Sequence, residues 1–440
     1  MWRRDFLKLC GSAGLGFASP IGSLDQLRAA EQDPPEGFYS GPYYVVFNAS
    51  GGWDTTYLMD PKGVDGINRL YQAGDILTAG EHRFAPTAKQ LESATESSGA
   101  PGGGISNEVF FEKYGPELLT LNGFDLSVNN HTPCSRYMAT GKLDSLAYPT
   151  FPALVAACQG ADAPLAFLTF GNYSATGNLV PMSRVPYLQS LNLLAKADSI
   201  SGVERHPYHD PFVSERIERT LEAQFEARVS QTRLPRVERS QSMLYAAQTS
   251  SQALRRVVPY IPKEPAKRRL AQQADISLAS FKAGVCVSAN LSIGQFDSHN
   301  NNDADQMKLI PELLGGIDYL LKRAEELQIR DRLVVIMQSE MGRTPTYNSG
   351  QGKDHWSIGS VMFLGAGIRG NRVVGATDAA QQLVPVNPST MAIDADQGIR
   401  VRPEHIHQAL RELAGIEDHA FCERFPLGVN ESERLQTLWA

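Results

Sequence analysis

The sequence predicts an α/β fold built on a doubly wound, mostly parallel sheet that carries a helical insertion. Short apolar, β-branched runs alternate with longer amphipathic stretches along the chain, a pattern typical of βαβ units. Polar clusters directly follow several of these runs, and open α/β sheets place their chemistry where strands end. With 440 residues, 42% of them hydrophobic and 20% charged, the chain is long enough to bury a large core.

The first half supplies three predicted strands and one short helix. The strand at 43–47, Tyr-Tyr-Val-Val-Phe, runs into a Gly-Gly-Trp-Asp loop at 51–54. Further apolar runs predict strands at 117–121 and 165–170. Between these two, residues 129–142 have the pattern of a loop, a helix and a glycine stop.

The middle of the chain differs in character. From about 211 to 282 the sequence is charged and poor in strand signals, and its periodicity predicts long helices at 213–229 and 268–281. We interpret this region as a helical insertion or cap over the sheet.

The last third returns to alternating elements. A strand is predicted at 285–293, followed by a helix at about 303–328 whose apolar face packs on the sheet. Because proline lacks the N–H that a helix interior needs, Pro311 should lie in the first turn or mark a late start of this helix. The remaining predicted elements are strands at 332–337 and 359–364 and a helix at 403–413.

The amino terminus resembles an export signal. Arg-Arg-Asp-Phe-Leu-Lys at 3–8 is a twin-arginine pattern, and a small, moderately apolar stretch follows it. We therefore expect residues 1–30 to engage the Tat export machinery, and the α/β domain to cover 43–440 in the periplasm or outside the cell. The alternative is an ordinary basic first helix. Apart from this signal, which would act as an anchor if left uncleaved, no segment is long enough for a transmembrane domain. The net charge of −7 disfavours a nucleic-acid surface.

Three polar clusters in the second half predict a metal centre. They lie at 296–300, 338–344 and 353–356, the first two after strand-like runs. Carboxylate and imidazole donors suit zinc first, with manganese, iron or calcium as alternatives, at one or two divalent metal ions. A hydrolytic metal centre is the hypothesis that these donors favour. The candidate ligands are Asp54, Asp297, His299, Glu340, Asp354 and His355.

These motifs carry a resemblance. The Gly-Gly-Trp-Asp loop, the Phe-Asp-x-His turn, the Ser-Glu-x-Gly-Arg-Thr-Pro segment and the Asp-His pair are similar to motifs of the alkaline phosphatase and sulfatase superfamily. The chain most closely resembles its Tat-exported branch, the domain of unknown function numbered 1501. The similarity covers nearly everything from Tyr43 to the carboxyl end.

The resemblance implies a two-metal hydrolase of phosphate or sulfate esters. Asp54 would be the first acid of the pattern, Asp297 and His299 the middle pair, Glu340 the next acid and His355 the last ligand, with Asp354 beside it. Two cations would stabilise the attacking and leaving oxygens of an anionic ester substrate. Arg343 would hold a substrate oxygen, since guanidinium groups bind such anions well.

The chain departs from the pattern at the nucleophile. It has His-Thr-Pro-Cys-Ser-Arg at 131–136, so counting from the proline places His131 where the nucleophile belongs. Thr132, Cys134 and Ser135 are neighbours that a small loop shift would present instead. His131 would otherwise be a metal ligand or a general base. The predicted catalytic residues are His131, Thr132, Ser135 and Arg343.

Ordinary structural roles are the alternatives for several of these residues. Asp54 would close a turn or cap a helix, Asp297 would cap the following helix, and Glu340 would pair with Arg343 on the surface. His355 would be a half-buried histidine with satisfied hydrogen bonds. The alternative at the level of function is a non-catalytic envelope binding or assembly protein that keeps the fold and a structural ion.

Overall fold

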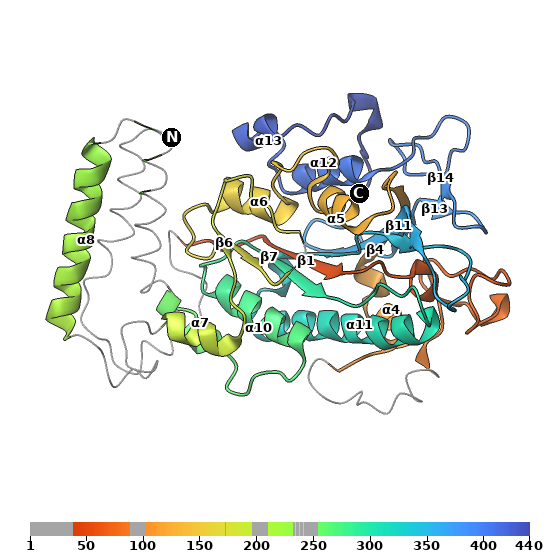
Figure 1. Cartoon of the computed structure of the whole chain (residues 1–440), viewed down its shortest axis with the longest axis horizontal. Coiled ribbons are helices and arrows are strands. Elements are labelled where there is room, and N and C mark those ends of the chain that lie inside the picture. Colours follow the sequence, from red (N-terminus) through yellow and green to blue (C-terminus); the bar gives the residue numbers. More distant parts are fainter. Residues whose placement is uncertain are drawn as a thin grey trace.

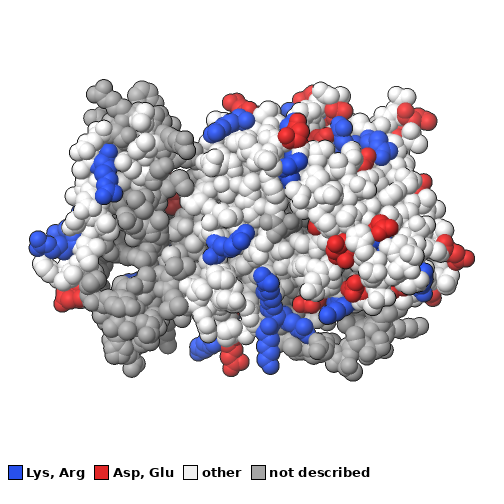
Figure 2. Space-filling view, in the orientation of Figure 1, with Lys and Arg blue, Asp and Glu red and all other residues white. Residues whose placement is uncertain are grey.

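A computed structural model describes residues 38–88, 103–171, 173–195, 210–231, 234, 237, 241 and 254–440. The expected export signal at 1–30 lies outside the described residues. Within them, no helix combines the length and the apolar character that crossing a bilayer requires. Figure 2 shows both basic and acidic side chains spread over the visible face.

Eight strands form the central sheet, in the order β12-β4-β11-β8-β1-β7-β5-β6 (Figure 1). β11 pairs antiparallel with β4 and β8, and the other neighbouring pairs are parallel. The predicted mostly parallel, doubly wound α/β fold is therefore confirmed. The strands are β1 (Tyr43–Ala49), β4 (Leu118–Asp125), β5 (Phe167–Thr169), β6 (Met182–Ser183), β7 (Ser288–Ile293), β8 (Leu333–Gln338), β11 (Ile358–Gly365) and β12 (Arg372–Val374).

Helices cover both faces of the sheet, which explains why every residue of β1 is buried. Tyr43, Val45 and Phe47 belong to a core that α10, α11 and α4 complete, whereas Tyr44 and Val46 belong to a second core with α5, α6 and α12. These two helical layers lie below and above the sheet in Figure 1. The helices are α4 (Asn107–Tyr114), α5 (His131–Thr140), α6 (Phe151–Gln159), α7 (Leu188–Ala195), α8 (Pro211–Gln231), α10 (Arg269–Lys282), α11 (Asn302–Glu326), α12 (Pro403–Leu413) and α13 (Ala420–Arg424).

Two details differ from the sequence-based expectations. The end of the expected insertion at 211–282 is α10, which is buried against the sheet and forms part of the core rather than a cap. Pro311 lies well inside α11, so its placement in the first turn was wrong. Its carbonyl accepts a hydrogen bond from the backbone N–H of Ile105 at 3.1 Å, and this contact docks the 103–105 segment on the helix.

Short two-stranded ribbons complete the structure, and one of them assembles the site. β9 (Gly342–Arg343) pairs antiparallel with β10 (His355–Trp356), which sets Arg343 opposite His355. Two of the polar clusters are thereby joined in space. The other ribbons pair β2 (Leu77–Ala79) with β3 (His82–Phe84) and β13 (Ala376–Thr377) with β14 (Leu383–Val384).

Candidate metal centre

The predicted cluster forms beyond the carboxyl ends of the central strands. Asp297 and His299 lie in the segment between β7 and α11, Glu340 follows β8, and His355 begins β10. His131 is the first residue of α5, whose N-cap is the Asn130 side chain.

Three of these side chains meet at one point. The Nε2 atoms of His299 and His355 lie 3.0 Å apart, and Asp297 Oδ1 lies 3.2 Å from the first and 3.3 Å from the second. His131 contacts the second oxygen of the same carboxylate, with its Nε2 3.3 Å from Asp297 Oδ2, and its ring centroid lies 4.4 Å from that of His355. Within the part of the chain described, His131, Asp297 and His355 also form a group whose ligand atoms lie within 4.8 Å of one another.

In His299 and His355, the hydrogen bond made by Nδ1 determines whether Nε2 carries a lone pair. His355 Nδ1 lies 2.9 Å from the carbonyl oxygen of Asn129, and His299 Nδ1 lies 2.8 Å from Asp354 Oδ1. Both partners only accept, so each Nδ1 carries the hydrogen, and in the neutral rings each Nε2 presents a lone pair. Two lone pairs and a carboxylate oxygen then face one another, an arrangement that a metal cation, or a proton on one of the rings, would stabilise.

The spacing fits a divalent metal ion. With metal–nitrogen and metal–oxygen bonds of about 2.0–2.2 Å, neighbouring ligands in a tetrahedral site lie about 3.3–3.5 Å apart, close to the three distances among His299, His355 and Asp297. Support of a ligating imidazole through its other nitrogen is also a regular feature of metal sites. The residues present therefore fit one ion.

Glu340 and His131 form the second part of the cluster. Glu340 Oε1 accepts from the backbone N–H of Gly51 at 2.7 Å and lies 3.2 Å from His131 Nδ1, while its buried Oε2 has no hydrogen-bond partner among the described residues. The hydrogen bond to Glu340, with help from Asp297, raises the pKa of His131 above its usual value despite partial burial. A buried carboxylate with an unpartnered oxygen is a further sign that positive charge belongs here.

Arg343 does not have the position expected of a substrate-binding group. Its side chain is fully buried, and it donates to Gly52 O at 2.9 Å, Lys353 O at 3.0 Å, Gly51 O and Asp297 Oδ1 at 2.7 Å. It thus fixes the orientation of Asp297. Burial alone would raise the pKa of Asp297, but the hydrogen bond and charge of Arg343 outweigh it and lower that pKa to about 2. The surface ion pair considered for Glu340 and Arg343 is also excluded, because both residues are buried.

Asp54 does not enter the cluster. Its side chain accepts from Thr56 N–H at 3.1 Å, from Asn302 Nδ2 at 3.0 Å and from Lys353 Nζ at 2.7 Å. It caps the short 3₁₀ helix Thr55–Tyr57, so the structural alternative for this residue is confirmed.

Asp354 and the nucleophile candidates have supporting positions. Asp354 lies behind His299 and also accepts from Asn348 Nδ2 at 3.1 Å. Thr132 is exposed in the first turn of α5, and Ser135 lies one helical turn beyond His131. Cys134 is buried, and burial raises the pKa of its thiol to about 12, so it is a poor nucleophile at neutral pH.

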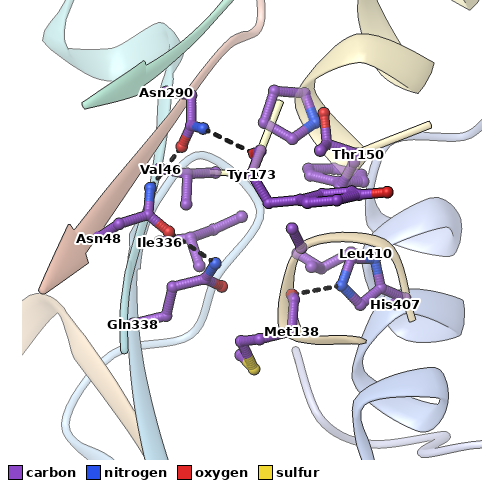
Figure 3. Close-up of a pocket in the computed structure, with 13 residues that line it drawn as sticks. Val46, Asn48, Met138, Thr150, Tyr173, Asn290, Ile336, Gln338, His407 and Leu410 are labelled. Carbon is purple, nitrogen blue, oxygen red and sulfur yellow. Dashed lines mark hydrogen bonds between the residues drawn. The ribbon is translucent and has the colours of Figure 1, made fainter. Parts of the chain in front are cut away.

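A small cavity lies between the sheet and the α5, α6 and α12 layer (Figure 3). Its volume of about 10 Å³ suits roughly one water molecule. Gln338 Nε2 donates to Asn48 Oδ1 at 3.0 Å, and Asn48 donates in turn to Asn290 Oδ1. These three side-chain amides link β8, β1 and β7 just before the loops that carry the cluster. They therefore hold the strand ends together and do not line the site.

Two contributors were missed from the sequence. Lys353 stands in one of the three polar clusters but received no role, although a lysine beside an Asp-His pair is a visible signal. The carbonyl of Asn129 has no side-chain signal, and only the fold brings it to His355.

Comparisons with solved structures give distant matches. A sulfatase from Pseudoalteromonas sp. is 11% identical, with 100% of this chain and 77% of that chain covered and a TM-score of 0.38. A TAB5 alkaline phosphatase mutant with magnesium bound is 8% identical, with 86% and 99% covered and a TM-score of 0.34. The lipoteichoic acid synthase of Listeria monocytogenes is 7% identical, with 86% and 79% covered and a TM-score of 0.34.

A search of curated proteins gives no match. The family described as "Protein of unknown function (DUF1501)" matches residues 189–422, more than half of the chain and the part that holds Asp297, His299, Glu340 and His355. The chain therefore belongs to the DUF1501 family.

Proposed function

We propose that this chain is an exported, metal-dependent hydrolase of phosphate or sulfate esters. The observation that carries the proposal is the meeting of two imidazole Nε2 atoms, 3.0 Å apart, with a carboxylate oxygen, while both Nδ1 atoms are held by acceptors. A divalent ion would be held by His299, His355 and Asp297. When bound, such an ion polarises an ester oxygen and neutralises charge that develops on it.

The neighbouring side chains supply the remaining chemistry. His131 is oriented by Glu340, which favours its protonated form; as an imidazolium it can donate a proton to the leaving oxygen. In its neutral form its Nε2 faces Asp297 Oδ2 and can serve as a further ligand. The hydroxyl groups of Thr132 and Ser135 are the nucleophile candidates at the start of α5.

Export is part of the proposal. The twin-arginine pattern at 3–8 supports passage through the Tat machinery, and a periplasmic or secreted location follows from it. Fusing residues 1–37 to a reporter protein and replacing Arg3 and Arg4 by Lys tests this point: the unaltered fusion should be exported and the altered one retained.

The activity is tested on the purified full chain. Bound metal is measured by mass spectrometry, and hydrolysis of p-nitrophenyl phosphate, bis(p-nitrophenyl) phosphate and p-nitrophenyl sulfate is followed before and after chelation and metal return. His299→Ala should lose metal and turnover by more than the roughly 10–100-fold that removal of a supporting partner causes. His419→Ala, which removes an imidazole at the cap of α13, should retain both.

The outcomes separate the two candidate functions. Turnover that chelation abolishes and metal restores would establish the hydrolase. Stoichiometric metal without turnover of any ester would instead favour the non-catalytic binding or assembly protein, and a chain that binds no metal would contradict the metal centre itself.

A further inference from the structure

The region around Asp54 already contains its own cation. Lys353 Nζ lies 2.7 Å from Asp54 Oδ2, and the side chains of both residues are 0% exposed. The ammonium group also lies 5.6 Å from the ring centroid of Tyr57 and 5.2 Å from that of Tyr347. A buried carboxylate, two aromatic faces and one ammonium group form a complete charge-balanced unit.

The rest of this pocket is closed by hydrogen bonds. Asn302 Nδ2 donates to Asp54 Oδ2 at 3.0 Å and its Oδ1 accepts from Ser298 Oγ at 2.6 Å. The backbone N–H of Asp54 donates to Gln306 Oε1 at 2.9 Å. The polar atoms that surround Asp54 are therefore engaged with one another.

One residue connects this unit to the metal cluster. Arg343 donates to the carbonyl oxygen of Lys353 at 3.0 Å and to Asp297 Oδ1 at 2.7 Å. The two carboxylates, Asp54 and Asp297, are thus parts of one assembly, but Asp54 is sealed and the Asp297 side chain is 43% exposed.

We infer that the centre holds a single divalent ion, and that the ammonium group of Lys353 occupies the position of a second cation beside Asp54. The inference rests on the proposed metal centre and concerns the number of ions. It departs from the two-metal arrangement that the superfamily resemblance implies, because the residues fit one ion at Asp297, His299 and His355 and none at Asp54. His131 and Glu340 border the same Asp297 carboxylate and bond each other, so they belong to the surroundings of that one ion.

The test is metal stoichiometry. The full chain is saturated with zinc or with manganese, freed of excess metal, and its ions per chain are counted by mass spectrometry, with calorimetric titration of each metal alone. The unaltered chain should hold one ion. Lys353→Ala leaves a vacant, negatively charged pocket at Asp54, and should show a second binding step that raises the count towards two.

Two further variants make the result specific. Asp54→Asn combined with Lys353→Ala removes both charges, so the count should return to one. Lys62→Ala is the matched control, because Lys62 is also a buried lysine, 2.7 Å from Asp60 Oδ1, but belongs to no part of the cluster; its count should stay at one.

Several results would overturn the inference. Two ions per unaltered chain would show that Lys353 does not replace a cation, and this measurement needs no variant to fold. A folded Lys353→Ala chain that binds one ion, as Lys62→Ala does, would contradict it as well. Absence of any bound ion would remove both the inference and the metal centre, whereas two ions with active hydrolysis would leave the proposed function intact.

Discussion

Asp297 and Asp54 are two carboxylates that follow central strands, and they differ in whether the chain alone supplies all of their positive partners. Asp297 is partly exposed: Arg343 bonds its Oδ1 from the buried side, and two imidazole Nε2 atoms lie beside it, so any further cation would come from solution. Asp54 is fully buried and meets Lys353, so its partner is part of the chain. The comparison shows that an acid at a strand end marks a place for a cation without saying whether that cation is a metal ion.

The largest expected effect is on the free energy of unfolding, through the buried ion pair of Asp54 and Lys353. Lys353→Met leaves Asp54 buried and unpaired, and loss of one partner of a buried ion pair costs about 3–5 kcal/mol of unfolding free energy. Denaturant unfolding of the metal-free chain measures this loss. Asp54→Asn in the same chain should recover much of the lost stability; no recovery would mean that the pair is not coupled.

The next effect concerns the open carboxylate cluster. Asp354→Asn weakens the support of His299 Nδ1, and loss of such a partner lowers metal affinity about 10–100-fold. Calorimetric titration with zinc measures the change, while unfolding of the metal-free chain should hardly move. Asp331→Asn, at a side chain that is 84% exposed, serves as the control and should leave zinc affinity unchanged.

The metal affinity of the cluster around Asp297 should depend on pH through His131. Because the pKa of His131 is raised above the ordinary 6.5, its proton must leave before Nε2 can bind metal, and zinc affinity should rise with pH by up to about tenfold per unit. In the metal-free chain the same shift stabilises the fold below pH 6.5, and this contribution is lost as pH rises through the folded pKa. His131→Asn should make both profiles shallower, since His299 and His355 still have to be neutral to bind metal; unchanged profiles would contradict the role given to His131.

The smallest effect is expected at Tyr347, whose ring lies beside the buried Asp54–Lys353 pair. Tyr347→Phe removes the hydroxyl that bonds Asp303 at 2.5 Å but keeps the ring near Lys353. The unfolding free energy should fall by about 1 kcal/mol, with zinc affinity and stoichiometry unchanged. A change in stoichiometry would show that the ring system, and not the charge pair, closes the pocket.

The sequence was informative where structure depends on local pattern. β1 and β8 were predictable because strands buried on both faces are continuous apolar runs, and α11 because its apolar residues recur with helical spacing. The place of Asp297 and His299 in the cluster followed from their position after a strand-like run, whereas His355 was assigned to it from the residue types of the Asp-His pair. Pro311 was misplaced because the helical pattern continues on both sides of it, and α11 keeps it in its interior although its missing N–H removes one bond of the helix.

The different roles of Asp54 and Asp297 could not be predicted from the local sequence pattern. Asp54 and Lys353 are separated by 299 positions, and no spacing rule connects them. Arg343 has the residue type of an anion-binding group, and only the packing of the loops around it turns its donors inward. Burial and long-range pairing, which decide these roles, arise only when the sheet is assembled.

The turn that begins α5 has one more consequence. It holds His355 through the carbonyl of Asn129 and presents His131 two residues later, so two imidazoles whose ring centroids lie 4.4 Å apart depend on one turn. A displacement of this turn would move both rings away from Asp297 together. A molecule that binds at residues 129–131 would therefore change the metal affinity of the proposed centre.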